Sequence, residues 1–330
     1  MALLELKDLH TFFRTKKGIV KAVNGVSYSV ETGRTLGVVG ESGSGKSVSA
    51  MSILQLLDGN GYIDSGEILF EGRDLTQLSE KEMYSVRGND ISVIFQEPMT
   101  SLNPVFTVSR QVSEPFIIHQ GMTKKQAAAK VIEMLADVKI PNPHIVAKQY
   151  PHQLSGGMRQ RVMIAMALAC KPKLLIADEP TTALDVTIQA QILKLMNDLK
   201  EEHGTSIIFI THDLGVIRQI ADDVAVMYCG QVVEMAPAGT IFMDAEFSHP
   251  YTEGLMNSIP RLSTPTHTRL DAIPGAVPHP LKLPKGCKFA PRCKYATERC
   301  LNEEPEMIHV SETQQVRCFY PRKEDRHGKK

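Results

Sequence analysis

Apolar and polar positions alternate along the first 35 residues of the chain. The apolar positions in this stretch are Leu4, Leu6, Leu9, Val23, Val26, Tyr28 and Val30. Such alternation is typical of antiparallel strands that bury one face. The run from Thr35 to Gly40 is short, apolar and ends in glycine, as buried parallel strands do. We therefore expect an antiparallel sheet, then one parallel strand, then a helix from about Lys46 to Leu57.

Two later apolar runs, Leu174–Ala177 and Ile207–Ile210, flank a helical pattern over Thr187–Glu202. Strand, helix and strand in this order predict a parallel sheet of βαβ units. Between Pro98 and Gln149 the pattern changes, and segments such as Lys125–Asp137 are alanine-rich and amphipathic. Because no internal repeat is present, we expect one α/β domain that carries a helical insertion.

The texture changes again from about Ser248, where proline becomes frequent. Prolines stand at Pro250, Pro260, Pro265, Pro274, Pro278, Pro280, Pro284 and Pro291. Proline lacks the backbone N–H group that helices and central strands need, so this region should be rich in loops. The chain length favours a main domain with an appendage, which we place at residues 1–245 and 246–330. Within the main domain, the helical subdomain should span about 98–165.

Charge and hydropathy narrow the classes of function. The 37 basic and 37 acidic residues cancel, so the basic excess typical of nucleic-acid binding is absent and we expect no nucleic-acid partner. No apolar run approaches the roughly 18–20 residues that cross a bilayer. Charged residues within the first eight positions also argue against a secretory signal. We expect a cytosolic chain whose membrane role, if any, comes through a partner.

The segment from Gly40 to Ser47 matches the phosphate-binding pattern G-x-x-x-x-G-K-[ST] between a predicted strand and a predicted helix. Its glycines let backbone N–H groups wrap around an anion at the positive end of the helix. Lys46 can reach the β- and γ-phosphates, and the Ser47 hydroxyl can bind Mg²⁺. A plain glycine-rich turn is the alternative, which this context disfavours. The expected nucleotide contacts are Ser42, Gly43, Ser44, Gly45, Lys46, Ser47 and Val48.

Two acids follow the apolar run at Leu174, namely Asp178 and Glu179. Ligands collect at the carboxyl edge of open α/β sheets, so paired carboxylates there suit a bound cation. We expect Asp178 to hold Mg²⁺ through water and Glu179 to act as general base on the attacking water. A solvated strand end would explain the acids alone, but not their company with a phosphate-binding loop.

A second glycine-rich turn, Ser155-Gly156-Gly157, precedes a helix. By itself it is equally a second anion cradle or an ordinary helix cap. Together with the motifs above, Leu154–Met158 resembles the LSGGQ signature of the ATPase subunits of ABC transporters. Met158 departs from the family's glutamine, at a position that begins a helix and contributes little direct chemistry.

The resemblance to ABC ATPases covers nearly the whole chain and implies further roles. It implies that two ATPase domains clamp ATP between the P-loop of one and the signature (Ser155, Gly156, Gly157) of the other. Gln96 looks like the Q-loop glutamine that senses Mg²⁺, and Ala183-Leu184-Asp185 looks like the D-loop. His212 looks like the histidine that contacts the γ-phosphate. Phe13, rather than Phe12, fits the adenine platform, with core packing as the competing explanation.

Several segments resemble the ATPase subunits of dipeptide and oligopeptide importers in particular. They are Gln96–Pro104, Asp178–Gln189, His249–Thr252 and the region from Gly286 to Cys318. This likeness implies two integral membrane permease subunits, a second related ATPase, and indirectly an extracellular substrate-binding protein. It also places the chain on the cytoplasmic face of the membrane, as a peripheral subunit. Nickel importers are the alternative within the family; an ATPase acting on DNA or ribosomes is the rival outside it.

Four of the six cysteines crowd into the proline-rich region with the spacing C-x5-C-x6-C-x17-C, at Cys287, Cys293, Cys300 and Cys318. In a reducing compartment such clusters favour metal over disulfides. Zinc sites usually show paired C-x2-C knuckles, which are missing here. A [4Fe–4S] cluster suits loosely spaced thiolates, and the family likeness favours it. Zinc and reduced free thiols remain the alternatives, and a metal-binding regulatory module would explain this region alone.

Overall fold

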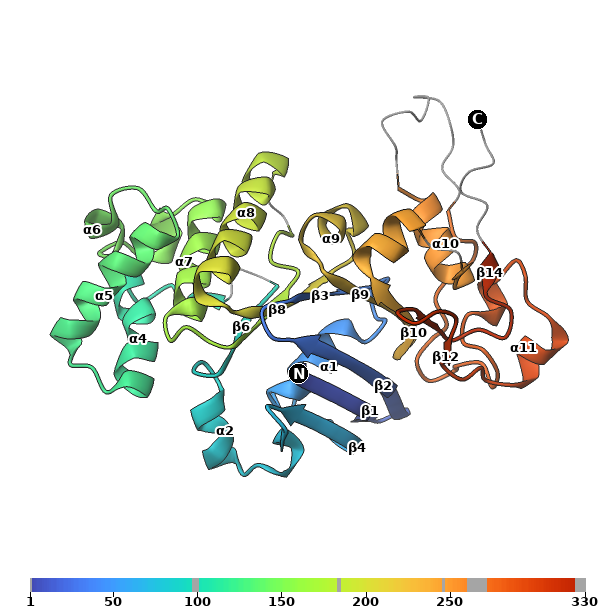
Figure 1. The fold of residues 1–330 in the computed structure, drawn as a ribbon. Coiled ribbons are helices and arrows are strands. Elements are labelled where there is room, and N and C mark those ends of the chain that lie inside the picture. The colour runs from blue at the N-terminus through green and yellow to red at the C-terminus, as the bar shows by residue number, and fades with distance from the viewer. Residues whose placement is uncertain (1, 97–100, 183–184, 245–246, 260–271, 324–330) are drawn as a thin grey trace. The chain divides into compact units, whose positions relative to one another are not determined.

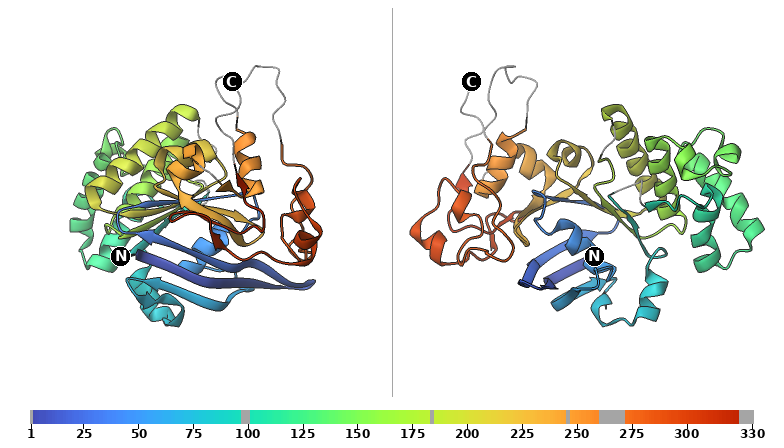
Figure 2. Two further views of the ribbon diagram at one scale, coloured as in Figure 1. Left: turned by 45° about the vertical axis from the view of Figure 1, so that its right-hand side comes forward. Right: turned by 180° about the vertical axis from the view of Figure 1, so that it is seen from behind.

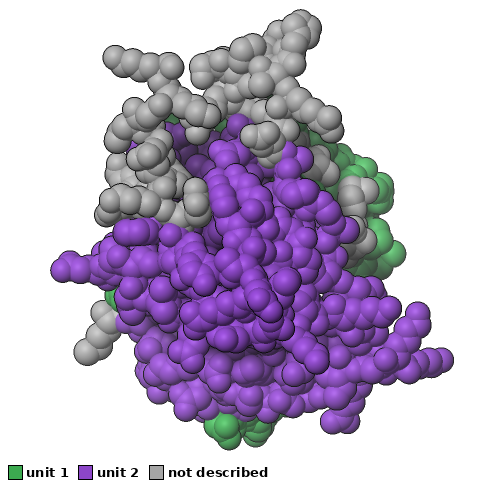
Figure 3. Space-filling view, turned by 90° about the vertical axis from the view of Figure 1, so that its right-hand side faces the viewer, with its two compact units in different colours: residues 1, 30–34, 77–210 green, residues 2–29, 35–76, 211–330 purple. Residues whose placement is uncertain are grey.

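The computed structural model describes residues 2–96, 101–182, 185–244, 247–259 and 272–323 (Figure 1). The chain divides into two units, shown in different colours in Figure 3. The first contains residues 1, 30–34 and 77–210, and the second contains residues 2–29, 35–76 and 211–330.

In the second unit, the predicted antiparallel sheet has the strand order β2-β1-β4-β5. Its strands are β1 (Ala2–Thr15), β2 (Gly18–Glu31), β4 (Gly61–Phe70) and β5 (Arg73–Asp74). All seven apolar residues that alternate along the first two strands are buried, which confirms the prediction. Helix α1 (Lys46–Ile53) lies against this sheet (Figure 2), where Thr11 Oγ1 and Ser52 Oγ are 2.8 Å apart.

Helix α1 is shorter than the sequence predicts, because it ends at Ile53 and not at Leu57. Gln55 adopts a left-handed backbone conformation with φ of 52°. A residue in this conformation ends a helix, because it turns the chain away from the helical path. The apolar pattern alone extends through Leu57 and does not reveal this stop.

A second sheet of the same unit contains β3 (Thr35–Val39), β9 (Asp223–Tyr228) and β10 (Gln231–Pro237). The strands β3 and β9 are parallel, whereas β10 runs antiparallel to β9. All five residues of β3 are buried, as predicted for a parallel strand. Helix α9 (Leu214–Ile220) packs on β3, where a Cβ atom added to Gly37 would lie 2.8 Å from Ile217 Cγ2.

The proline-rich region adds strands to this second sheet. The strands β12 (Ile308–His309) and β13 (Gln315–Val316) continue it beyond β10, with Glu234 opposite Val316. The rest of the described region is mainly loop. Its other elements are β11 (Phe247–Ser248), α10 (Pro250–Asn257), the 3₁₀ turn η4 (Ala290–Arg292), α11 (Glu298–Asn302) and β14 (Arg322–Lys323). The units divide the chain differently from our boundary at 245/246, which stays a prediction together with the subdomain at about 98–165.

In the first unit, three parallel strands lie in the order β8-β7-β6. They are β6 (Ile91–Ile94), β7 (Leu174–Asp178) and β8 (Ser206–Thr211), and every residue of β7 and β8 is buried. Helix α8 (Val186–His203) connects β7 to β8, which confirms the predicted βαβ unit. The stretch Pro98–Gln149, where the pattern changes, contains the helices α4 (Val108–Gln120), α5 (Lys124–Asp137) and α6 (Pro143–Val146). Helix α7 (Gly156–Leu168) follows it. Helix α2 (Glu80–Val86) precedes β6.

Local sequence sets the ends of these helices. Thr123 and Gln126 form a reciprocal capping box at the start of α5, and Gly121 ends α4 with a left-handed φ of 63°. The helix predicted over Lys125–Asp137 is thereby confirmed. Within the described residues, every helix is either too short or too polar to cross a bilayer.

Buried polar groups connect the C-terminal region, the proline-rich appendage predicted at residues 246–330, to β10. The carboxylate of Glu234, which is fully buried, accepts hydrogen bonds from His249 N and from Gln314 Nε2, both at 2.8 Å. His249 Nδ1 in turn accepts a hydrogen bond of 3.0 Å from Tyr251 N. Burial lowers the pKa of His249 to about 3, against an opposing hydrogen bond with the backbone of Arg317. His249 is therefore a neutral, buried structural side chain.

Acidification should destabilise the protein through His249. The imidazole of His249 takes up a proton near pH 6.5 in the unfolded chain but only near pH 3 in the folded chain. The stability that neutral His249 contributes is therefore complete above pH 6.5 and is lost progressively as the pH falls from 6.5 to 3. The expected loss is about 2 kcal/mol between pH 8 and pH 5, at about 1.4 kcal/mol per pH unit. Urea unfolding at both pH values should show a weaker pH dependence for His249→Asn, and an unchanged one for the exposed control His144→Asn. Equal pH dependence in His249→Asn and the wild type would contradict this assignment.

Candidate functional site

The predicted P-loop lies between β3 and α1, in the strand–loop–helix context that the motif requires. Gly40 has φ of 154°, and a Cβ atom there would lie 2.1 Å from the carbonyl oxygen of Met227. Gly45 has φ of 96°, and its Cβ atom would lie 2.3 Å from the carbonyl oxygen of Ala22. Only glycine fits at either end of the loop, because any side chain would collide with backbone.

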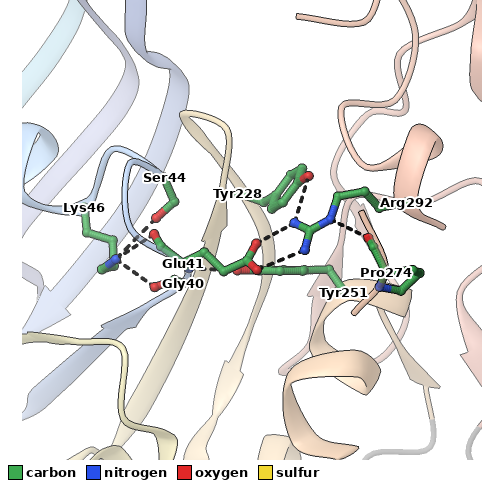
Figure 4. Close-up of polar contacts among 8 residues, drawn as sticks. All are labelled: Gly40, Glu41, Ser44, Lys46, Tyr228, Tyr251, Pro274 and Arg292. Carbon is green, nitrogen blue, oxygen red and sulfur yellow. Dashed lines mark hydrogen bonds and ion pairs between the residues drawn. The ribbon is translucent and has the colours of Figure 1, made fainter. Parts of the chain in front are cut away.

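The ammonium group of Lys46 lies inside the curve of the loop (Figure 4). Lys46 Nζ donates hydrogen bonds to Gly40 O at 2.7 Å, Glu41 O at 3.0 Å and Ser44 Oγ at 3.4 Å. Gly230 N, in the turn between β9 and β10, donates to Ser44 O at 2.9 Å. A helix N-terminus and a buried cation inside a tight backbone loop form a cradle for an anion such as phosphate.

In the first unit, the structure brings two of the predicted residues together. Gln96 Nε2 donates a 3.0 Å hydrogen bond to Glu179 Oε2, although 83 positions separate them in the sequence. Thr182 Oγ1 donates to the same oxygen at 2.9 Å. These two donors orient the carboxylate, which a general base needs. Asp178, the last residue of β7, is buried at 6 % exposure.

The backbone at Glu179 is unusual. Its φ is 46°, a left-handed value that side chains other than glycine rarely adopt, and Glu179 N donates to Ile210 O at 2.9 Å. Strained backbone of this kind persists where surrounding contacts hold it, and it is concentrated at functional sites. Among the non-glycine residues with a left-handed φ, Glu179 is the one that the motif also marks as the general base.

The Ser155-Gly156-Gly157 turn forms the N-terminus of α7. Ser155 Oγ accepts a hydrogen bond of 3.3 Å from Met158 N, which is ordinary helix capping. Gly157 packs closely, because its Cβ atom would lie 3.0 Å from Ile188 Cγ2. Capping and anion binding do not exclude each other, since further N–H groups of the first turn have no partner within the helix.

The remaining predicted residues are placed as follows. Asp185 caps α8 by accepting from Ile188 N at 2.9 Å, whereas Ala183 and Leu184 of the D-loop lie outside the described residues, as do positions 97–100. His212 directly follows β8 and is exposed. Phe12 is buried at 7 % exposure and Phe13 is half-buried, so Phe13 is the better placed of the two for stacking. Val48 lies in the first turn of α1.

The four clustered cysteines converge on one cavity. All six cysteines of the chain are free thiols. The cavity is lined by His249, Pro250, Cys287, Phe289, Ala290, Cys293, Tyr295, Cys300, Pro305, Cys318, Phe319 and Tyr320. Burial raises the pKa of Cys287, of Cys293 and of Cys318, the last to about 11.

The thiols share this cavity without forming a coordination site. In the part of the chain that the structure describes, no group of three or more histidine, cysteine, aspartate or glutamate side chains is arranged to hold a metal ion. The chemistry of the donor set nevertheless fits zinc or iron, because four residues with soft sulfur ligands line one cavity. Neither the zinc ion nor the [4Fe–4S] cluster of the sequence analysis follows from this geometry alone.

Sequence reasoning missed two residues that contact the P-loop, Arg292 and Tyr251, and a third, Tyr228, that contacts Arg292. Arg292 and Tyr251 both bind Glu41, and the hydroxyl of Tyr228 accepts a hydrogen bond from Arg292 (Figure 4). Arg292 and Tyr251 lie inside segments that resemble peptide importers. No spacing rule pairs them with Glu41, because Arg292 is 251 positions and Tyr251 is 210 positions away from it in the sequence.

Two family models match the chain. The model described as "ABC transporter" matches residues 23–182, and the model described as "Oligopeptide/dipeptide transporter, C-terminal region" matches residues 233–300. Among curated proteins, the chain is 52 % identical over 318 residues to the oligopeptide transport ATP-binding protein AppD of Bacillus subtilis, covering 96 % of each chain. It is 50 % identical over 319 residues to OppD of Salmonella typhimurium, covering 97 % of this chain and 94 % of the relative.

Solved structures give the same family. The dimeric structure of MJ0796, a bacterial ABC transporter cassette, has a TM-score of 0.64 at 29 % identity, covering 71 % of this chain and 98 % of the other. The same cassette in a post-hydrolysis state bound to ADP and Pi matches equally well. The fold is thus that of an ABC ATPase, as predicted. The chain belongs to the ATP-binding proteins of ABC transporters and carries the C-terminal region of their oligopeptide/dipeptide branch.

Proposed function

We propose that this chain is the ATP-hydrolysing subunit of an ABC importer that takes up di- or oligopeptides through partner membrane subunits. The P-loop carries the ATPase part of the proposal, because two close backbone approaches and the enclosed Lys46 make a phosphate cradle. The names of the relatives and the C-terminal family match support peptides over nickel. Both family models that match the chain describe transporters, which favours a role in transport over an action on DNA or ribosomes.

We assign the nucleotide contacts by motif, each residue in its own role. Residues 42–48 hold the phosphates, and Phe13 stacks on the adenine. Ser47, Gln96 and Asp178 bind Mg²⁺, whose charge offsets that of the β- and γ-phosphates. Ser155, Gly156, Gly157 and Asp185 serve the nucleotide of the partner ATPase, and His212 contacts the γ-phosphate.

Glu179 is the proposed general base. Its carboxylate takes the proton of the attacking water as the oxygen of that water bonds to the γ-phosphorus and the bond from phosphorus to ADP breaks. The hydrogen bonds from Gln96 and Thr182 support this role, because they fix the orientation of Glu179 Oε2. Gln96, which contacts this carboxylate, is also one of the residues that would hold Mg²⁺.

The partners follow from the same proposal. We expect two integral membrane permease subunits, a second related ATPase, and an extracellular substrate-binding protein that does not contact this chain directly. The subunit would then lie peripherally on the cytoplasmic face of the membrane. Co-purification from native membranes tests this: two polytopic proteins and one related ATPase would support the importer, whereas soluble DNA-associated or ribosomal proteins would overturn it.

We also propose that Cys287, Cys293, Cys300 and Cys318 hold a [4Fe–4S] cluster, with Zn²⁺ as the alternative. The shared cavity and the absence of disulfides support a soft metal group. When bound, such a group would brace a region that has few regular elements of its own. Cys287, Cys293 and Cys318 would have to lose their protons to bind it, against the burial that raises their pKa.

Glu179→Gln should lower phosphate release about 10²–10⁴-fold, the usual cost of losing a general base. The amide preserves the shape of the carboxylate, so ATP should still bind and should hold two ATPase subunits together. Phosphate release and size-exclusion chromatography with ATP measure the two effects. Glu202→Gln, at an exposed position of α8, is the matched control and should match the wild type. Near-normal hydrolysis by Glu179→Gln would assign the base elsewhere.

Anaerobically purified protein should contain about four iron and four sulfide ions per chain. Cys300→Ser should lose them, because it removes one of the four thiols of the cavity, whereas Cys170→Ser, which lies outside that cavity, should keep them. Iron, acid-labile sulfide and zinc assays measure the outcome. Zinc without sulfide would replace the cluster by the alternative ion, and folded protein without either metal would refute the proposal.

A further inference from the structure

Glu41, the second residue of the P-loop, forms a two-pronged ion pair with Arg292 (Figure 4). Arg292 Nη1 lies 2.6 Å from Glu41 Oε2, and Arg292 Nη2 lies 3.0 Å from Glu41 Oε1. Parallel contacts of this type are stronger and more directional than a single charged hydrogen bond. A side chain of the C-terminal region, Arg292, is therefore bound to the P-loop.

The guanidinium of Arg292 is itself held on all sides. Its Nε donates to Pro274 O at 2.9 Å, and Nη1 also donates to Tyr228 Oη at 3.3 Å. The side chain is 4 % exposed, whereas that of Glu41 is 30 % exposed. A buried arginine with partners at all three nitrogens cannot swing away, so it fixes where the carboxylate of Glu41 lies.

Tyr251 holds the backbone of the same residue. Glu41 N donates a 2.8 Å hydrogen bond to Tyr251 Oη, and Tyr251 is fully buried. The ring of Tyr251 packs against Tyr228 and Phe289, with centroids 4.7 and 5.4 Å away. The amide and the carboxylate of Glu41 are thus both held by residues from outside the P-loop, while its carbonyl accepts from Lys46.

The charge of Glu41 would oppose the ligand of this loop. A carboxylate on a loop that holds a polyphosphate repels it, and the repulsion grows as the surroundings become less aqueous. Arg292 neutralises this charge and draws the carboxylate toward Pro274 and Tyr228, while Lys46 lies on the opposite side of Glu41 in Figure 4. The interaction thus affects both the shape and the electrostatics of the cradle.

Arg292 also adjoins the cysteine cavity. It ends the 3₁₀ turn η4 and directly precedes Cys293, and Cys293 and Phe289 both line that cavity. Cys293 thus lines the cavity, while the guanidinium of Arg292, the preceding residue, binds Glu41 of the P-loop. Any change that moves this turn would move the partner of Glu41.

We infer that Arg292 is a positioning residue of the nucleotide site, through which the C-terminal region sets the affinity of the P-loop for ATP. The inference rests on the proposed nucleotide site at Ser42–Val48. Arg292 acts by neutralising Glu41 and by holding the start of the loop in its binding conformation. The C-terminal region is then a working part of the ATP site.

Arg292→Gln should raise the Kd for ATP about 5–150-fold, the range of typical coupling energies, measured by titration of the full chain with a fluorescent ATP analogue. The hydrolysis rate at saturating ATP should change far less, because Arg292 does not touch the reacting atoms. Arg292→Lys should lie between the two, since lysine keeps the charge but not the two-pronged geometry. It also keeps the test open if Arg292→Gln does not fold.

Removing the charge of Glu41 should restore part of the ATP affinity that Arg292→Gln loses. The double variant Glu41→Gln/Arg292→Gln should bind ATP more tightly than Arg292→Gln, because no unpaired carboxylate remains on the loop. A purely structural role for Arg292 predicts no such rescue. Arg299→Gln is the matched control, because Arg299 pairs with Glu303 at an exposed site of the same region, and it should bind ATP like the wild type.

Lys46→Ala separates this inference from the proposal on which it rests. If Lys46→Ala loses ATP binding while folded Arg292→Gln and Arg292→Lys bind like the wild type, the inference is wrong and the nucleotide site stands. If Lys46→Ala still binds ATP normally, the proposed nucleotide site is wrong, and the inference fails with it.

Discussion

The close approach of the P-loop to neighbouring backbone is the constraint on which the candidate site depends. Gly40 and Gly45 pass so near the carbonyls of Met227 and Ala22 that no side chain fits at either position. Tight backbone packing sets the curve of the loop, and that curve encloses Lys46. Since Met227 belongs to β9 and Ala22 to β2, the shape of the loop depends on two different sheets of the same unit.

The second unit is held together by polar groups as well as by its apolar core. Glu234 on β10 and Glu41 in the P-loop are both carboxylates that take partners from the C-terminal region. Glu234 and Arg292 are the buried charges of these contacts, so removing the partner of either leaves a desolvated charge, which costs more than the pair itself contributes. The C-terminal region and the rest of this unit are therefore difficult to vary separately.

The periodicity of apolar residues predicted most of the fold. In strands β1, β2, β3, β7 and β8, the apolar residues that the pattern indicates are buried. The periodicity missed the early end of α1, because the left-handed turn at Gln55 leaves no apolar signal. The loops that carry chemistry follow motifs that a sequence displays directly, such as Gly40–Ser47. The pairing of Gln96 with Glu179 and that of Arg292 with Glu41 depend on tertiary folding, so they could be learned only from the structure.

The extra strands β12 and β13 protect a sheet edge. Strand β13 pairs with β10 at Glu234 and Met235, and β12 pairs with β13 on its other side. Arg317 N adds a hydrogen bond of 2.8 Å to Val233 O. A chain cut before these strands would leave the N–H and C=O groups along β10 without their neighbours, as a template for pairing with other chains. A shorter ATPase, cut at the end of the main domain, would thus expose an unpaired strand edge that can pair with other chains. The C-terminal residues protect the solubility of the protein, whatever else they contribute.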